Sequence, residues 1–219
     1  MDKLRLRFEK TGRAVYISHL DLMRTMQRVF LRAGVPLKYS EGFNPHAEIS
    51  IALPLSVGAE SVCEILDFKV KENIAFEGLA ETLTAAMPEG IRATAVYEAE
   101  RKWKEIKWLR ISGRLEYDDR DHAAMAQALN AFYAAESIVI RKKTKRGEGE
   151  TDIRPAIHEI AFCADENHVT LQAVISAQDP TLNPELLVDA LRQKAPELAP
   201  DFAAFRRLEI LDTEGNLFI

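Results

Sequence analysis

The chain has few cysteines and no long apolar run. Its 219 residues include only Cys63 and Cys163, with no CxxC or CxxxC spacing. Disulfide frameworks, cysteine-rich zinc sites and cysteine-ligated clusters therefore have no support, and both cysteines are expected to be buried and inert. No stretch approaches the roughly eighteen apolar residues that cross a bilayer, and the N-terminal MDKLRLRFEK does not resemble a signal peptide. We therefore expect a cytoplasmic protein without membrane contact.

Motifs for nucleotide, metal and covalent chemistry are also missing. GxGxxG, GxxxxGK[ST], GxSxG, HxH and HExxH do not occur, and the single GxG, Gly147-Glu148-Gly149, lies in a charged segment. Phosphate loops, metal sites and nucleophile elbows all depend on such spacings. We expect no metal and no cofactor, and a binding module is favoured over an enzyme.

Hydrophobic residues make up 47% of the chain and charged residues 29%, which is ordinary for a globular protein with a core. The net charge of −5 argues against nonspecific binding to nucleic acid, but the charge is segregated. Residues 1–50 hold nine Lys/Arg against five Asp/Glu, whereas residues 51–98 hold three against eight. Further basic clusters lie at 101–114 and at 141–146. Such local patches can bind phosphates on an acidic protein.

Residues 18–33 carry the signals of a capped helix. Ser18 and Asp21 form the [ST]-x-x-[DE] start, and Gly34 followed by Pro36 marks the stop. Leu22, Met26, Val29, Phe30 and Ala33 share one face at helical spacing, and Arg24, Arg28 and Arg32 share the opposite one. The arginines are therefore candidate ligand-binding residues. The alternative is a solvated face on which Asp21 pairs with Arg24.

The segment after this helix combines turn formers with aromatic and hydrogen-bonding side chains. Gly42 and the Asn44-Pro45 pair indicate a turn. A surface turn does not require aromatic residues, so their presence suggests a surface for a planar or anionic partner. The candidate ligand-binding residues here are Lys38, Tyr39, Ser40, Glu41, Phe43, Asn44 and His46.

Strand and helix signals alternate in the N-terminal half. Leu4, Leu6 and Phe8 alternate with charged residues, which is typical of a half-buried strand. After the capped helix we expect short extended pieces at 36–39 and 48–53, a strand at 62–70, a helix at 75–87 and a strand at 91–97. This order fits the βαββαβ unit.

The same order returns in the C-terminal half, without residue-by-residue similarity. The expected elements are a strand at 108–117, a helix at 122–135, strands at 137–142, 157–164 and 168–176, a helix from Asn183 and Pro184 to Lys194, and a strand at 205–211. We therefore predict an α+β protein of two tandem ferredoxin-like (βαββαβ) domains with antiparallel sheets, at residues 1–100 and 105–219. One larger α+β domain with a continuous sheet is the alternative.

The segment KKTKRGEGETDI at 142–153 is too polar for a core and is expected to be a protruding hairpin loop. Pro155 favours a defined extended conformation for the preceding residue, whereas a disordered tip is the alternative. The candidate ligand-binding residues of this region are Arg141, Lys142, Lys143, Lys145, Arg146 and Arg154.

His19 is a weak catalytic candidate. It occupies the first turn of the helix, where the macrodipole favours the neutral imidazole that suits a general base. No second catalytic group is placed beside it by spacing, so a capping or surface role is favoured.

Several strings together resemble a known family. YISHLDLMR, RAGVPLKYSEGFNPHAEISIALPLSVGAES and the later TDIRP are similar to the radical-SAM-associated domain of unknown function. The resemblance implies a stand-alone bacterial member that works beside a radical SAM protein. The chain lacks the three-cysteine cluster motif, so it is not the radical enzyme itself.

Three functions are compatible with these features. The leading hypothesis is a non-catalytic module that binds RNA or another polyanion through the arginine face, the aromatic turn and the basic loop, with RNA modification or maturation as its hypothesised role. The second is a protein-interaction subunit that docks onto a radical SAM enzyme. The third is a metal-independent ribonuclease in which His19 is the base and Arg24 and Tyr39 stabilise charge.

Overall fold

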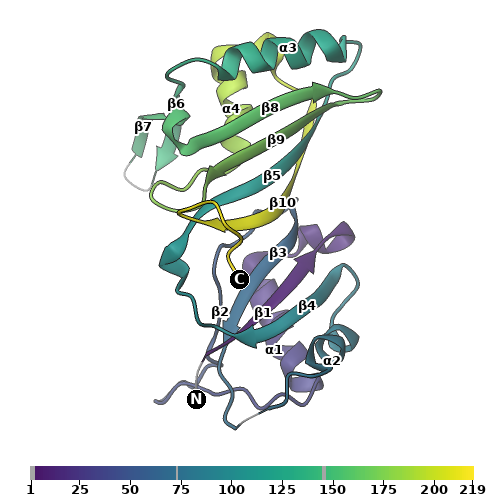
Figure 1. Ribbon diagram of the computed structural model, residues 1–219, viewed down its shortest axis with the longest axis vertical. Helices are drawn as coiled ribbons and strands as arrows, with labels where there is room; N and C mark the ends of the chain where they lie inside the picture. The colour runs from purple at the N-terminus through teal and green to yellow at the C-terminus, as the bar shows by residue number, and fades with distance from the viewer. Residues whose placement is uncertain (1–2, 73, 145–146) are drawn as a thin grey trace. The chain divides into compact units, whose positions relative to one another are not determined.

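The computed structural model describes residues 3–72, 74–144 and 147–219. The chain divides into two compact units (Figure 1), which are described separately: residues up to 105 together with Ile219, and residues 106–218. The fold is mixed α+β, with four α-helices and antiparallel strand pairing among the described residues. In that part of the chain, no helix is long and apolar enough to cross a membrane.

The first unit is a sheet with two α-helices packed on one face. Its elements are β1 (Leu4–Lys10), η1 (Gly12–Tyr16), α1 (His19–Arg32), β2 (Ile49–Ile51), β3 (Glu60–Phe68), α2 (Leu79–Ala86), β4 (Ile91–Glu98) and the 3₁₀ helix η2 (Trp103–Glu105). Strand β1 lies between β4 and β3, and β2 pairs with β3. All three pairings are antiparallel.

The capped-helix prediction is confirmed for α1. Ser18 is the N-cap, and its side chain accepts a hydrogen bond from the Asp21 backbone N–H at 3.2 Å. The apolar face of α1 is buried against β1 and β3, with Phe30 and Phe68 ring centroids 4.7 Å apart. Leu79 and Leu83 of α2 join the same core, so both helices cover one face of the sheet.

Alternation along β1 decides which side chains face the helices. Leu4, Leu6 and Phe8 point into the core, and the alternate residues Arg5 and Arg7 point to the other side. That side carries no α-helix of this unit, and we call it the open face of the first sheet. The cross-strand partner of Arg5 on β3 is Asp67.

Two expected elements of this unit are shorter than predicted. The helix expected at 75–87 begins only at Leu79, because Gly78 before it has a φ of 70°, outside the right-handed helical region. Of the extended pieces expected at 36–39 and 48–53, only Ile49–Ile51 forms a strand, and Leu37 and Tyr39 each form an isolated bridge.

The second unit is also a sheet with two α-helices on one face. Its elements are β5 (Ile106–Glu116), α3 (His122–Tyr133), β6 (Val139–Thr144), β7 (Gly147–Asp152), η3 (Arg154–Ala156), β8 (Ile157–Ala164), β9 (Val169–Ser176), α4 (Glu185–Lys194), η4 (Pro196–Leu198) and β10 (Phe202–Asp212). The antiparallel strand order is β10-β5-β9-β8, and β6 and β7 form a separate hairpin.

Tyr133 links the two helices of the second unit to its sheet. Its ring stacks on Phe162 of β8 with centroids 5.3 Å apart, and its hydroxyl donates to the Leu187 carbonyl of α4 at 2.6 Å. Burial raises the pKa of the Tyr133 hydroxyl well above its ordinary value. Both helices therefore pack on one face of this sheet, whose other face we call the open face of the second sheet (Figure 1).

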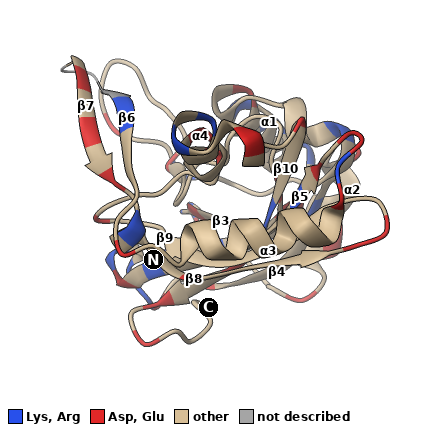
Figure 2. Ribbon diagram, turned by 90° about the horizontal axis from the view of Figure 1, so that it is seen from above, with Lys and Arg blue, Asp and Glu red and all other residues tan. Residues whose placement is uncertain are grey.

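Two sequence-based expectations are wrong in this unit. Residues 147–152 form strand β7 and not a loop, because acidic β7 pairs with basic β6 (Figure 2): Arg141 lies opposite Glu150 and Lys143 opposite Glu148. Cys63 is buried as expected, but Cys163 is exposed, because it alternates with Phe162 and faces away from the core.

Candidate functional site

The turn after α1 is an ordered loop that exposes an aromatic ring. Tyr39 and Ala47 bridge the base of the loop, and the Ser40 backbone N–H donates to the His46 carbonyl at 2.9 Å. The Ser40 hydroxyl contacts His46 Nδ1 at 3.0 Å and accepts from the His46 backbone N–H at 3.1 Å. This clasp closes the loop below Phe43, whose relative exposure is 111%. The loop thus projects a phenyl ring into solvent.

Three lysines lie at the base of this loop. Lys71 Nζ is 5.8 Å from the Tyr39 ring centroid, which is within cation–π range. Lys69 Nζ and Lys38 Nζ lie 2.6 Å and 4.0 Å from the Glu48 carboxylate. The hydrogen bond from Lys69 is the main cause that lowers the pKa of Glu48, and the charges of Lys69 and Lys38 add to it. Glu48 therefore remains an anion that orients two lysines.

A pocket of about 240 Å³ adjoins the loop, on the open face of the first sheet. Its polar lining comes from Lys3, His46, Glu48, Ser50, Asp67 and Lys69. His46 belongs to both the loop clasp and the pocket wall, so the clasp adjoins the pocket. We call the loop that carries Phe43 together with this pocket the loop–pocket surface. Cations, a hydroxyl, an imidazole and carboxylates are all available there for hydrogen bonding.

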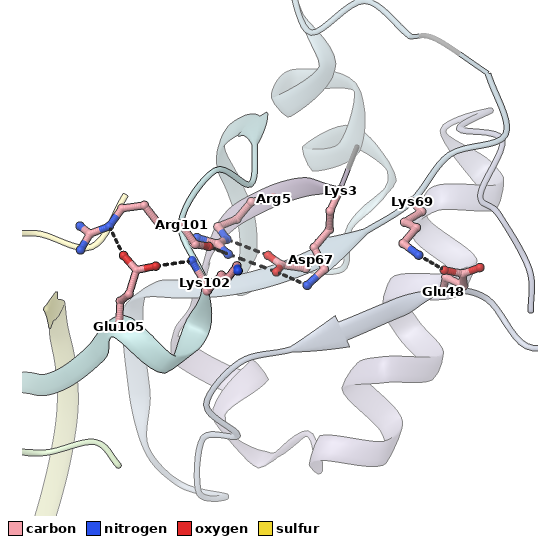
Figure 3. A network of polar contacts seen from close by, with 8 residues as sticks. All are labelled: Lys3, Arg5, Glu48, Asp67, Lys69, Arg101, Lys102 and Glu105. Carbon is pink, nitrogen blue, oxygen red and sulfur yellow. Dashed lines mark hydrogen bonds and ion pairs between the residues drawn. The ribbon is translucent and has the colours of Figure 1, made fainter. Parts of the chain in front are cut away.

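Asp67 of the pocket lining belongs to a buried ion pair with Arg5 (Figure 3). Arg5 donates from Nε and Nη2 to the two Asp67 oxygens at 2.7 Å and 3.1 Å, and Lys3 Nζ lies 3.0 Å from Asp67. Both side chains of the Arg5–Asp67 pair are about 1% exposed or less. Because both Asp67 oxygens contact these cations, Asp67 contributes a compensated charge to the pocket lining and not a free negative charge.

The segment before the second unit covers part of this ion pair. Arg5 Nη2 also donates to the Arg101 carbonyl at 2.9 Å, and Lys3 Nζ lies 4.9 Å from the Trp103 ring centroid. Glu105 closes the segment by accepting from the Lys102 backbone N–H at 2.9 Å and from Arg101 Nε at 3.1 Å. These contacts, with the backbone bond from Lys102 as the largest cause, lower the pKa of Glu105.

The arginine row of α1 does not share a face with the pocket. Arg24 pairs with Asp21 at 3.1 Å, as the solvated-face alternative anticipates, and Arg32 donates to the Ala86 carbonyl of α2 at 2.9 Å. Arg28 is exposed and makes no hydrogen bond or ion pair to another described residue. The helix packs on the core face of the sheet and Asp67 lies on the open face, so the sheet separates the row from the pocket.

The basic hairpin of the second unit carries its own counterions. Arg141 Nε lies 4.0 Å from Glu150, and Gln193 of α4 binds the Arg141 backbone N–H and carbonyl at 2.8 Å and 3.1 Å. Lys142 is partly exposed, Lys143 lies in β6, and Lys145 and Arg146 lie outside the described residues. The described part of the hairpin thus holds one ion pair between its strands and is anchored to α4 through Gln193.

The remaining sequence candidates occupy peripheral positions. Arg154 donates to the Ala135 and Ile157 carbonyls at 3.2 Å and 2.8 Å, which joins the end of α3 to β8. Glu41 and Asn44 are exposed beside Phe43, and His19 is the partly exposed first residue of α1. Among the residues described, no group of three or more His, Cys, Asp and Glu side chains is placed to hold a metal ion.

Sequence reasoning missed Lys3, Arg5, Asp67 and Lys69. The signal was present: Arg5 alternates with apolar residues in LRLRF, and Asp67 interrupts the apolar run of VCEILDF. A charged residue inside a strand is costly to bury alone and therefore predicts a partner across the sheet. The sequence alone does not show which strand supplies this partner.

A family model described as "Uncharacterized protein conserved in bacteria (DUF2344)" matches residues 3–184. No curated protein matches the chain. A Cbf5-Nop10-Gar1 complex structure aligns at 11% identity and TM-score 0.48, covering 94% of this chain and 48% of that one, so the match spans about half of the larger protein.

Two further structures align at lower scores. An unknown protein from Galdieria sulphuraria shows 10% identity and TM-score 0.27, with 94% of this chain and 98% of that one covered. Thermus thermophilus Cse3 bound to an RNA shows 14% identity and TM-score 0.22, with 93% and 98% covered.

Proposed function

The chain belongs to the bacterial DUF2344 family of uncharacterized proteins, and we propose that it is a non-catalytic module that binds single-stranded RNA through the loop–pocket surface. The observation that carries this proposal is the complete exposure of Phe43 on an ordered loop beside lysines. Fully burying a phenylalanine side chain is worth about 1.5–3 kcal/mol. Folding of this chain gains none of this free energy, because Phe43 stays exposed. Binding of a planar ligand that stacks on the ring would gain part of it.

The chemistry around the ring fits a nucleotide. Aromatic side chains stack on unpaired bases, and lysines beside them neutralise phosphates. Lys71 and Lys38 are exposed next to Tyr39, and the adjoining pocket offers Ser50 and His46 for hydrogen bonds to a base or ribose. The formal charge of residues 1–105 is balanced, with 15 Lys/Arg and 15 Asp/Glu. We therefore expect stacking to supply most of the affinity and salt-dependent contacts a smaller part.

We also infer that both units are variants of the ferredoxin-like βαββαβ arrangement. In the first unit β1 lies between β4 and β3, and in the second β5 lies between β10 and β9, with the β6–β7 hairpin inserted after α3. Such folds leave one sheet face free of helices, and RNA-binding domains of this type use that face. The pocket of the first unit lies on the equivalent face.

The first test removes the ring. In fluorescence anisotropy with a labelled single-stranded RNA, Phe43→Ala should weaken binding roughly 5- to 150-fold, since stacking is worth about 1–3 kcal/mol per base. Tyr16→Ala is the matched control, because Tyr16 is also aromatic and is 76% exposed. It lies in η1, after the C-terminal end of β1, whereas Lys3 of the pocket lies before the N-terminal end of β1. Equal affinity of Phe43→Ala and the parent protein, with RNA bound, would refute the loop as the contact.

A charge-removal pair tests which side of the sheet meets RNA. Lys71→Gln should lower the slope of log affinity against log salt by about 0.7, the value for one phosphate contact on a single strand. Arg28→Gln removes the same charge from the outer face of α1 and should leave the slope unchanged. The reverse result would assign RNA to the arginine row of α1 in place of the loop–pocket surface.

A second candidate function is docking onto a radical SAM enzyme, which the sequence resemblance implies. The outer face of α1 favours it, because Leu20 and Leu31 are 67% and 77% exposed there with Arg24 and Arg28 between them. Such a mixed apolar and basic surface suits an acidic protein partner. Titration calorimetry with a radical SAM enzyme of the same bacterium tests this, and binding that Leu31→Glu does not weaken would exclude this face.

A further inference from the structure

The open face of the second sheet carries aromatic side chains at both ends and arginines between them. By register, the even-numbered residues of β5 from Trp108 to Glu116 face away from the α3 and α4 core, and so do Phe202 and Arg206 on neighbouring β10. Glu159 of β8 lies on the same face beyond β9, with one carboxylate oxygen 4.0 Å from Arg110 Nη1. At one end Trp108 stacks on His158, with ring centroids 4.9 Å apart and planes inclined by 28°. At the other end Phe202 is 56% exposed.

A bulge places the imidazole on the indole. The register of β8 against β9 shifts between Ile157 and Glu159, so His158 is the extra residue that turns toward Trp108. The His158 side chain is 57% exposed, and Lys107 Nζ lies 5.5 Å from the Trp108 ring centroid. One face of the imidazole is therefore backed by the indole, and the ring is open to solvent on the other side of the pair.

Two arginines between the aromatic ends of this face are oriented by ion pairs with carboxylates. Arg110 Nε donates to Glu209 at 2.7 Å, and Arg114 Nε pairs with Glu116 at 3.1 Å. The two side chains are 44% and 56% exposed, and each guanidinium has further N–H donors beyond the paired Nε. Because each arginine carries a local counterion, this face holds oriented hydrogen-bond donors with little net charge.

We propose that the open face of the second sheet is an additional contact surface for single-stranded RNA, on which a nucleobase stacks against His158 backed by Trp108. This inference rests on the RNA-binding function proposed above and extends it to a second unit. An extended strand presents alternating planar bases and phosphates, which matches aromatic rings separated by guanidinium donors. The paired charges predict a contact dominated by stacking, with affinity that depends little on salt.

The test uses the full chain with Trp103→Phe, so that Trp108 is the sole tryptophan. Addition of single-stranded oligouridylate should change Trp108 emission saturably. His158→Ala should weaken binding roughly 5- to 150-fold without changing the salt slope, and His158→Phe, which keeps a planar ring, should retain most of the affinity. Circular dichroism of each variant confirms that the fold is unchanged.

The outcomes separate this proposal from the one on which it rests. One outcome refutes the second surface and leaves the loop–pocket surface standing. In it the parent chain binds RNA and Phe43→Ala weakens this binding, but RNA does not change Trp108 emission and His158→Ala binds RNA as tightly as the parent chain. If His158→Ala weakens binding while Phe43→Ala does not, the second surface stands and the loop is refuted. If no RNA binds to the parent chain, both fail.

Discussion

Replacement of Asp67 by alanine should strongly destabilise the first unit. The change leaves the Arg5 guanidinium buried without its carboxylate, although the bond to the Arg101 carbonyl remains. Removal of one partner from a buried ion pair costs about 3–5 kcal/mol, because the other charge stays in a poorly solvated site. Domains of this size are stable by about 5–15 kcal/mol in total. The loss is therefore a large share of the stability of this unit.

The structure provides a matched control in the same sheet. Arg92 binds the Glu9 carboxylate through Nε and Nη2 at 3.1 Å and 3.0 Å, so this pair has the same two-pronged geometry between neighbouring strands. The Arg92 side chain is 61% exposed. Exposed pairs are worth about 0–1 kcal/mol, because water solvates the charges in either state. Glu9→Ala should therefore change stability little.

Urea denaturation measures both variants. Trp103 packs near Lys3 in the first unit, so its emission in a Trp108→Phe background reports unfolding of that unit. With slopes of about 1–3 kcal/mol per molar urea, Asp67→Ala should lower the midpoint by about 1 M or more. The double variant Arg5→Met with Asp67→Leu should recover most of the loss. Equal midpoints for Asp67→Ala and Glu9→Ala would refute the inference that burial makes the Arg5–Asp67 pair more important for stability than the exposed Arg92–Glu9 pair.

Two other perturbations follow from burial and backbone geometry. Burial raises the pKa of Tyr117 to about 12 and that of Tyr133 further, whereas an unfolded tyrosine ionises near pH 10. The two tyrosines therefore contribute to stability below pH 10, and this contribution is lost as the pH rises through 12. Thermal unfolding over a series of alkaline pH values measures the loss, and an unfolding temperature that does not change over this range would contradict the prediction. Gly90→Ala should destabilise by more than about 1 kcal/mol in calorimetry, because its φ is +85° and an added Cβ clashes with a backbone oxygen. Gly58→Ala is the control, with a φ of +91° and open space, and an equal loss in both would exclude the clash.

The local sequence pattern was enough to predict the helices and strands whose boundary signals lie within a few residues. The Ser18 cap and the apolar spacing of α1 act within a few residues, and the helix is found where they place it. The alternation of LRLRF likewise predicts a strand with a charged side, which β1 has. The wrong predictions also have local causes. Helix α2 begins later than predicted because of Gly78, and the predicted loop at 147–152 is a strand because the opposite charges of β6 and β7 favour pairing.

The sequence by itself determined the helix, the half-buried strands, the exposed arginines and the aromatic turn, because each depends on neighbours within a few residues. Only the tertiary structure decided which of these groups meet. The Arg5–Asp67 contact joins residues 62 positions apart, and it requires the register of β1 on β3. The same register puts the pocket on the face of the sheet opposite the arginine row of α1. Helical and strand periods assign a residue to a side of its own element, but the packing of elements assigns that side to a surface.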